Sequence, residues 1–266
     1  MDKKRCIAVA GLIGMEMWVC AGAVAQKVPT LGEILQRLQE NLEQYDSSVP
    51  SFFCDESVTT HAQRGPGPVN TMVGTVTDST FLLKRIPRPD DQVTLRESRE
   101  VKKVNGKPVT GDSVGGGILT VGAFSDGMAL VSLSQQACMD YRLMPIDAGQ
   151  PMLVEFASVA ADKRPADCRM QEDVSGRAAI DPETMQVKQM QFHAPHHMIG
   201  KKMGWWDVTI DYAPVELDGK IFFLPKKISE SMSDRAYSWS YEARYRNYHK
   251  MEATSRILPS DETPAP

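Results

Sequence analysis

The chain has 266 residues, five of them cysteines, and a formal net charge of −4. The length suits one large domain, and so few cysteines indicate a fold held by a hydrophobic core and not by disulfides. Neutralisation of phosphate charge supplies most nucleic-acid affinity, so a mildly acidic chain without a run of Lys or Arg beyond residues 3–5 excludes nucleic acid as a partner.

The N-terminal segment has the three parts of a signal peptide. Residues 3–5 are positively charged, residues 6–15 are apolar, and residues 23–25 (Ala-Val-Ala) fit the small-x-small rule for signal peptidase. We expect residues 1–25 to be removed by cleavage after Ala25, which gives a periplasmic or secreted protein. Glu16 cuts the apolar stretch below the roughly 18 residues that span a membrane, and no second long apolar run follows. The mature protein is therefore expected to lack a transmembrane segment.

Cys54, Cys138 and Cys168 follow the expected cleavage site. An odd number allows at most one internal disulfide and leaves one thiol over. A bond between Cys138 and Cys168 would close a loop of about 30 residues and contribute roughly 3 kcal/mol. Buried free thiols are the alternative for all three. In the signal segment, Cys20 is disfavoured as a lipidation site because small residues do not precede it.

Residues 30–45 predict an amphipathic helix that packs on the rest of the domain. Thr30 and Glu33 match the T-x-x-E capping box, in which each side chain satisfies an amide of the first turn. An apolar stripe follows at helical spacing: Leu31, Ile34, Leu35, Leu38, Leu42 and Tyr45.

Most of the remaining chain predicts β-strands. Asn105-Gly106 is its strongest hairpin signal, and residues 181–184, with Pro182, predict a turn between two strands. The clearest alternation places one set of side chains on a single strand face: Tyr237, Trp239, Tyr241, Ala243 and Tyr245.

Long strands in series with one clear helix predict an α+β fold. We expect a large curved antiparallel β-sheet, a half-open barrel, packed against the N-terminal amphipathic helix. Residues 26–258 are expected to form a single domain and residues 259–266 a disordered tail. One helical stripe cannot cover so large a sheet, so the sheet must curl or its concave face must bind something.

Residues 111–115 match the G-x-S-x-G pattern, with Ser113 as the hypothetical nucleophile. A nucleophile elbow needs a buried strand before the serine and a helix after it, whereas here a charged hairpin precedes and three glycines follow. Asp211 and His249 would complete a Ser–Asp–His order, but nothing around them marks a triad. We assign no catalytic residue and keep a serine hydrolase that uses Ser113 as an alternative.

His193, His196 and His197 could ligate zinc or copper, with Asp207 or Asp211 as a carboxylate partner. Their spacing is loose and Pro195 precludes a helical arrangement, so an exposed histidine-rich loop is the competing interpretation. We assign no metal site. Phosphate-binding loops and a dinucleotide fingerprint are absent from the sequence, and no cofactor is expected.

The aromatic and methionine content points to an apolar binding surface. Methionine-rich surfaces adapt to partners of variable shape, such as acyl chains or amphipathic peptides. For each residue taken alone, a place in a large β core is the competing interpretation. The predicted ligand-binding residues are Trp206, Phe222, Tyr237, Trp239 and Tyr241.

Residues 176–187 (GRAAIDPETMQV), then Leu224-Pro225 and residues 229–231, carry a resemblance to a known family. With the N-terminal helix and the extended sheet, they resemble the periplasmic lipoprotein-carrier proteins and the related sigma-factor regulator sensor domains. Residues 49–56 and 105–109 are similar to uncharacterised exported proteins of soil bacteria. The resemblance implies a half-open barrel whose concave face holds lipid acyl chains, without catalytic residues.

The sequence thus favours a non-catalytic periplasmic protein that binds a lipid or lipoprotein acyl chain in a concave sheet face. Its expected partners are a lipid or a lipidated protein, with an envelope protein as a further partner. Two alternatives stay open: the serine hydrolase, and an envelope interaction module that uses its sheet edge and binds no ligand.

Overall fold

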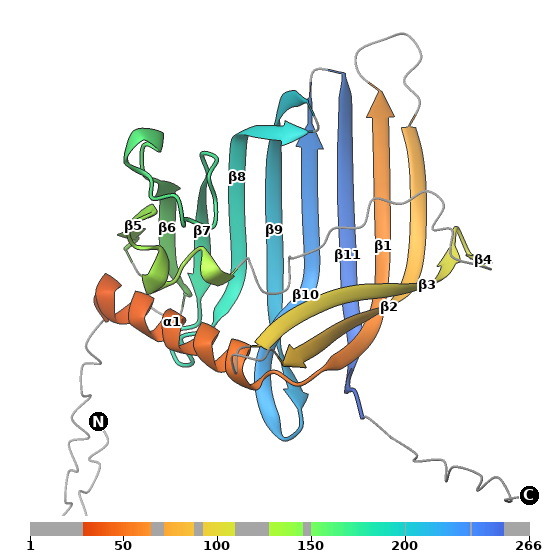
Figure 1. Ribbon diagram of the computed structural model, residues 1–266, viewed down its shortest axis with the longest axis horizontal. Coiled ribbons are helices and arrows are strands. Elements are labelled where there is room, and N and C mark those ends of the chain that lie inside the picture. The colour runs from red at the N-terminus through yellow and green to blue at the C-terminus, as the bar shows by residue number, and fades with distance from the viewer. Residues whose placement is uncertain are drawn as a thin grey trace, which may run out of the picture.

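The computed structural model describes residues 29–64, 72–87, 93–109, 128–145, 150–199, 201–234 and 236–252. Within these ranges the chain forms one long α-helix and an 11-stranded antiparallel sheet (Figure 1). No helix in the described part of the chain is long and apolar enough to cross a membrane. The expected signal peptide, the expected tail and Ser113 lie outside the described residues.

Helix α1 spans Leu31–Ser48, and two short 3-10 helices, η1 at Leu133–Gln135 and η2 at Ala161–Lys163, lie between strands. The strands in chain order are β1 Phe52–Arg64, β2 Met72–Pro87, β3 Val93–Val104, β4 Lys107–Pro108, β5 Met139–Leu143, β6 Met152–Ser158, β7 Ser175–Ile180, β8 Val187–Ile199, β9 Lys202–Leu217, β10 Lys220–Ser233 and β11 Tyr237–Lys250.

The first and last strands of the chain, β1 and β11, pair in the interior of the sheet. The spatial order is β4-β3-β2-β1-β11-β10-β9-β8-β7-β6-β5, so only the β1–β11 pair joins strands that are distant in sequence. The edges β4 and β5 lie at opposite ends of a sheet that curves around a concave face (Figure 1). The predicted α+β fold, a curved and unclosed antiparallel sheet with one helix, is confirmed.

Helix α1 is capped at both ends. The Thr30 hydroxyl accepts a hydrogen bond from the Glu33 amide at 3.3 Å, and the Glu33 carboxylate accepts one from the Thr30 amide at 2.6 Å, as the capping box predicted. At the other end, the Arg85 guanidinium of β2 donates to the carbonyls of Asp46 and Ser47, both at 2.7 Å. A cation at this end also complements the helix dipole, and the helix runs past its predicted end at Tyr45.

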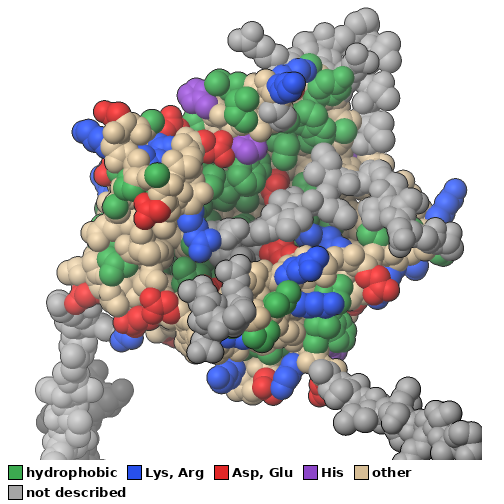
Figure 2. Space-filling model, in the orientation of Figure 1, with side chains coloured by type: hydrophobic (Ala, Val, Ile, Leu, Met, Phe, Trp, Pro, Cys, Tyr) green, Lys and Arg blue, Asp and Glu red, His purple; other side chains and the backbone are tan. Residues whose placement is uncertain are grey.

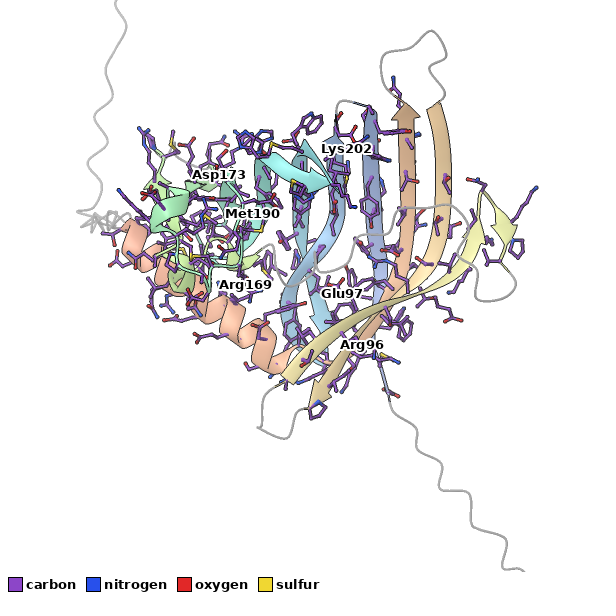
Figure 3. The ribbon with its side chains drawn as sticks, turned by 45° about the horizontal axis from the view of Figure 1, so that its top comes forward. Arg96, Glu97, Arg169, Asp173, Met190 and Lys202 are labelled. Atoms are coloured by element: carbon purple, nitrogen blue, oxygen red, sulfur yellow. A yellow bond between two sulfur atoms is a disulfide. The ribbon has the colours of Figure 1, made fainter. Side chains whose placement is uncertain are left out.

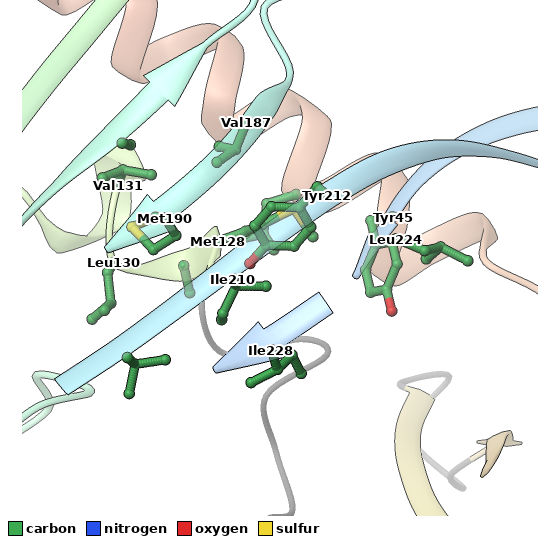
Figure 4. Packing of buried hydrophobic residues seen from close by; sticks show 14 of the residues in the cluster. Tyr45, Met128, Leu130, Val131, Val187, Met190, Ile210, Tyr212, Leu224 and Ile228 are labelled. Carbon is green, nitrogen blue, oxygen red and sulfur yellow. The ribbon is translucent and has the colours of Figure 1, made fainter. Parts of the chain in front are cut away.

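The hydrophobic core lies between α1 and the concave face of the sheet. The helix contributes Ile34, Leu38 and Leu42, and residues 128–131 join the same cluster (Figure 4). The fully buried strand residues in this cluster include Met152, Val154, Ala178, Ile180, Met190 and Ile210. The apolar stripe predicted from the sequence therefore packs on the sheet through Ile34, Leu35, Leu38, Leu42 and Tyr45.

Cys138 and Cys168 form a disulfide with Cα atoms 5.7 Å apart. It ties the residue before β5 to the connection between β6 and β7. Of the two alternatives for the cysteines, the structure shows the disulfide. Cys54 is a buried free thiol, and burial, helped by the nearby Glu56 carboxylate, raises its pKa. Cys54 is therefore a core residue and not a nucleophile.

Both predicted turns are present. Asn105 and Gly106 connect β3 to β4 with positive φ angles of 49° and 75°. Between β7 and β8, the Asp181 carboxylate accepts hydrogen bonds from the amides of Glu183 and Thr184, both at 3.0 Å. Residues that tolerate positive φ and side chains that bond the local backbone set these turns, which is why the sequence predicts them.

Candidate ligand-binding face

The upper end of the concave face, where the β8–β9 and β10–β11 connections lie in Figure 1, carries a row of large apolar side chains. Met232 of β10 pairs with Trp206 of β9 and with Trp239 of β11. The three side chains are therefore neighbours on one face, and each is half-buried. We call Trp206, Met232 and Trp239 the upper row. Figure 2 shows hydrophobic side chains gathered at this end of the molecule, beside histidines.

Further rings extend the upper row. Tyr237 stacks on Trp239, with ring centroids 5.6 Å apart, and Phe192 meets Trp206 edge to face at 5.1 Å. The Lys202 ammonium lies 5.4 Å from the centroid of the Tyr237 ring, at the upper end of the sheet (Figure 3). Aromatic contacts of these kinds fix ring orientations, so the surface is held in shape by its own packing.

The five predicted ligand-binding residues do not all meet. Trp206, Tyr237 and Trp239 come together at the upper end, and Tyr241 lies one row lower, where it is buried. Phe222 is elsewhere: it pairs with Val215 near the β9–β10 turn and belongs to the buried core. A register shift after Pro225 separates Phe222 from the upper part of β10. The side-chain alternation in the sequence could not show this shift.

Below the upper row, the concave face becomes polar. Glu230 of β10 pairs with Tyr241 and Val208, is 3% exposed, and accepts a hydrogen bond from the Trp206 indole at 3.2 Å. The same hydrogen bond orients Trp206 in the upper row. Sequence reasoning missed Glu230, although its place between Ile228 and Met232, at an inward-facing position, signals a buried acid.

A buried ion pair lies further down on the β1 side. The Arg99 Nε of β3 is 2.8 Å from both carboxylate oxygens of Glu56 on β1, and the Ser79 hydroxyl donates to the same carboxylate at 2.5 Å. Burial alone would lower the pKa of the Arg99 guanidinium, but the Glu56 carboxylate raises it. Burial, and then the Glu56 charge, raise the pKa of Tyr241 to about 12. Arg99 therefore stays charged and Tyr241 stays neutral at neutral pH.

The histidines lie in different places. His193 is on the outer face, where it is paired with Asp207 at 2.6 Å. His197 lies against the Trp206 ring of the upper row, with ring centroids 4.8 Å apart, and is paired with the Glu172 carboxylate at 2.9 Å, so two of the three histidines have separate partners. Among the described residues, no group of three or more His, Cys, Asp and Glu side chains could hold a metal ion. The hypothesised cluster of imidazoles around one metal is therefore not formed by these residues.

The acid and the base of the hypothetical hydrolase each contact other residues. His249 stacks on Phe53 with ring centroids 5.2 Å apart, and Asp211 accepts a hydrogen bond from Gln189 at 2.7 Å. The base and the acid thus have partners other than each other. Ser113 lies outside the described residues.

Comparisons with known proteins show a distant structural similarity and no sequence match. No family model and no curated protein match the sequence. The structure is similar to a LolA-superfamily protein from Nitrosomonas europaea, with 12% identity, a TM-score of 0.34, and coverage of 86% of this chain and 96% of that one. It is also similar to a domain assigned as an outer membrane lipoprotein-sorting protein from Vibrio parahaemolyticus (9%, 0.36, 82% and 92%) and to a DUF1329-family protein from Desulfovibrio piger (11%, 0.36, 82% and 92%).

These structures include the class of protein that the sequence resembles. At such identities and TM-scores the chains overlap only roughly. What this protein binds has to be argued from its own side chains.

Proposed function

We propose that this protein is exported and binds an acyl chain, from a lipid or a lipidated protein, against the upper row of its concave face. The observation that carries the proposal is the half-buried state of Trp206, Met232 and Trp239, side by side on a concave surface. Burying apolar surface contributes about 25 cal/mol per Å², so a ligand that covers these side chains gains affinity without any polar contact.

The side chains on the rest of the concave face also limit where an acyl chain can bind. Lower on the same face, the side chains of α1 occupy the concave side of the sheet. On β1 and β10, an acyl chain placed lower on the face would have to displace the partners of the buried Glu56 and Glu230 carboxylates, and hydrocarbon cannot replace those hydrogen bonds. The expected position of the ligand is therefore across the upper row, with Tyr237 at its outer side.

The side chains of the upper row suit an acyl chain of variable length. Met232 stands between two indoles, and its unbranched thioether side chain adapts its shape to a neighbour. The ring of Trp206 is fixed by Glu230, and the ring of Trp239 by Tyr237. Two fixed rings with one adaptable side chain between them favour an extended aliphatic ligand over a rigid one. The signal-peptide pattern of residues 1–25 supports an envelope location for this binding.

Native mass spectrometry on protein purified from a periplasmic extract tests the proposal. We expect a bound acyl species, which is retained in Phe53→Asp and lost in Trp239→Asp. Phe53 is the matched control, because it is an aromatic residue 37% exposed on β1 and stacked on His249. A ligand-free mass that persists after phospholipid is added would contradict acyl binding and favour the interaction module.

A further inference from the structure

The end of the β8–β9 hairpin exposes large hydrophobic side chains. Met198, Met203 and Trp205 are 53%, 61% and 37% exposed. Met198 pairs with Met203 across the hairpin, and Trp205, two residues further along β9, shares the face of Met203. These three side chains form one apolar surface, which we call the hairpin face. Trp206 has the opposite orientation and belongs to the upper row.

The hairpin is held firmly in place. Its end bends across the top of the sheet (Figure 1), where the β8–β9 register shifts between Ala194 and His197. A Cβ atom on Gly204 would lie 2.2 Å from the Ser233 carbonyl oxygen, so β9 packs directly on the end of β10. Lys202 reaches Asp234 at 3.5 Å, and His197 reaches Glu172. The exposed residues thus belong to a supported element.

The charge of this hairpin differs from that of the whole chain. Residues 194–206, which form the hairpin end, contain Lys201 and Lys202 and no Asp or Glu, in a chain with a net charge of −4. Because Lys202 is paired with Asp234, Lys201 carries the exposed charge of the hairpin. Lys201 is exposed at the turn, next to the methionines. A positive apolar hairpin is complementary to a negatively charged surface with an apolar interior.

The residue types match a lipid surface more closely than a folded protein. Tryptophan rings favour the headgroup level of a bilayer, and lysine side chains bury their stems while the ammonium group stays with the phosphates. Specific protein interfaces need roughly 20 residues on each side, many more than the hairpin face supplies. Shallow insertion of an amphipathic element needs only a few apolar side chains and a positive charge.

We propose that the hairpin face docks the protein onto a lipid bilayer that contains anionic lipids. Met198, Met203 and Trp205 enter the headgroup region, and Lys201 contacts lipid phosphates. Docking in this way brings the upper end of the concave face to the membrane, because Trp206 directly follows Trp205. The inference does not rest on acyl binding: the hairpin face docks whether or not the upper row holds a ligand.

Flotation of the exported protein with vesicles tests the docking. The vesicles contain phosphatidylcholine with about one-third phosphatidylglycerol, to supply the anionic surface. We expect the wild type to float with the vesicles and its tryptophan emission to shift to shorter wavelength. Met198→Ser/Met203→Ser is expected to lower the vesicle partition coefficient at least about tenfold. Lys201→Glu is expected to lower it about fivefold, and to have little effect on pure phosphatidylcholine.

Ile221→Ser supplies the matched control, because Ile221 is 67% exposed on the β9–β10 hairpin at the opposite end of the sheet. Its partition coefficient should equal that of the wild type. Wild-type protein that does not float with the anionic vesicles, or equal binding by the wild type and the double methionine variant, would overturn the proposal. Native mass spectrometry of the same variants separates the two sites: hairpin variants keep a bound acyl species, and Trp239→Asp keeps vesicle binding.

Discussion

The two halves of the concave face bury different kinds of side chain. On β6 to β9, the inward positions are apolar, and α1 with residues 128–131 packs against them. On β1, β2 and β10 the same face carries every strand-borne polar side chain that is buried in the described part of the chain: Glu56, Thr60, Thr75, Thr77, Ser79 and Glu230. We call these the helix-packed half and the polar half.

The difference follows from what each half meets. The helix-packed half receives an apolar helix stripe and gains stability from area removed from water. The polar half receives β3, which curls across the lower end and brings Arg99 to Glu56 (Figures 1 and 3). Buried charges need a partner, so the stability of the polar half depends on specific charge pairs, whereas that of the helix-packed half depends on filling the core with apolar side chains. Mutations in the two halves should therefore lower the free energy of unfolding for different reasons.

The largest effect is expected in the polar half. Arg99→Met leaves the Glu56 carboxylate, whose side chain is fully buried, without its cation. We expect a loss of about 3–5 kcal/mol in the free energy of unfolding, measured by urea denaturation. Arg96→Met, an exposed arginine on the same strand, should change it by less than about 0.5 kcal/mol.

The double variant Glu56→Met/Arg99→Met sharpens this test. It removes both charges and should recover most of the loss, because a buried pair is often replaced by apolar residues at little cost. A double variant as unstable as Arg99→Met would show that the loss comes from packing and not from the unpaired charge.

In the helix-packed half, Met190→Ala should destabilise through the cavity it leaves. Met190 is fully buried against the core, and such truncations cost about 2–4 kcal/mol. Met198→Ala on the same strand is the control, because its side chain is half exposed and its removal leaves no cavity. Similar losses for both variants in urea denaturation would contradict the burial of Met190.

Arg85 links the two halves, since it extends from β2 of the polar half to the C-terminus of α1. Arg85→Met removes its hydrogen bonds to the helix carbonyls and should cost about 1–2 kcal/mol. Thermal unfolding measures this loss. Lys84→Met, at the exposed neighbouring position, should leave the melting temperature unchanged. An unchanged melting temperature in Arg85→Met would show that water satisfies the helix end equally well.

The smallest effect is expected at the surface turn between β7 and β8. Backbone amides, with Lys188, lower the pKa of Asp181 from 3.8 to about 2. A lowered folded-state pKa stabilises the protein above pH 3.8, and this contribution is lost as the pH falls towards 2. Asp181→Asn should cost up to about 1 kcal/mol at neutral pH, given solvent screening, and flatten stability between these pH values.

Glu183→Gln supplies the control for Asp181, because Glu183 is exposed in the same turn. Acid titration of stability in both variants checks the assignment. Parallel pH profiles for the wild type and Asp181→Asn between pH 2 and 3.8 would contradict it.

Local signals predicted much of the fold but only part of the candidate face. Trp206, Tyr237 and Trp239 were predicted together and lie together, because period-two alternation identifies side chains on one strand face. Phe222 shares the alternation but lies at the other end of β10, beyond a register shift. Met232 and Glu230 complete the face, and they could be found only once β10 was known to lie between β9 and β11.

The sequence by itself indicated the capped helix, a series of strands and two of the turns between them, since each depends on side chains a few residues apart. It left the disulfide between Cys138 and Cys168 as one of two alternatives. Only the tertiary structure decided the β1–β11 pairing, the Arg85 cap on α1 and the Glu56–Arg99 ion pair. Each of these joins residues that are distant in the chain, and the curvature of the whole sheet determines whether they meet.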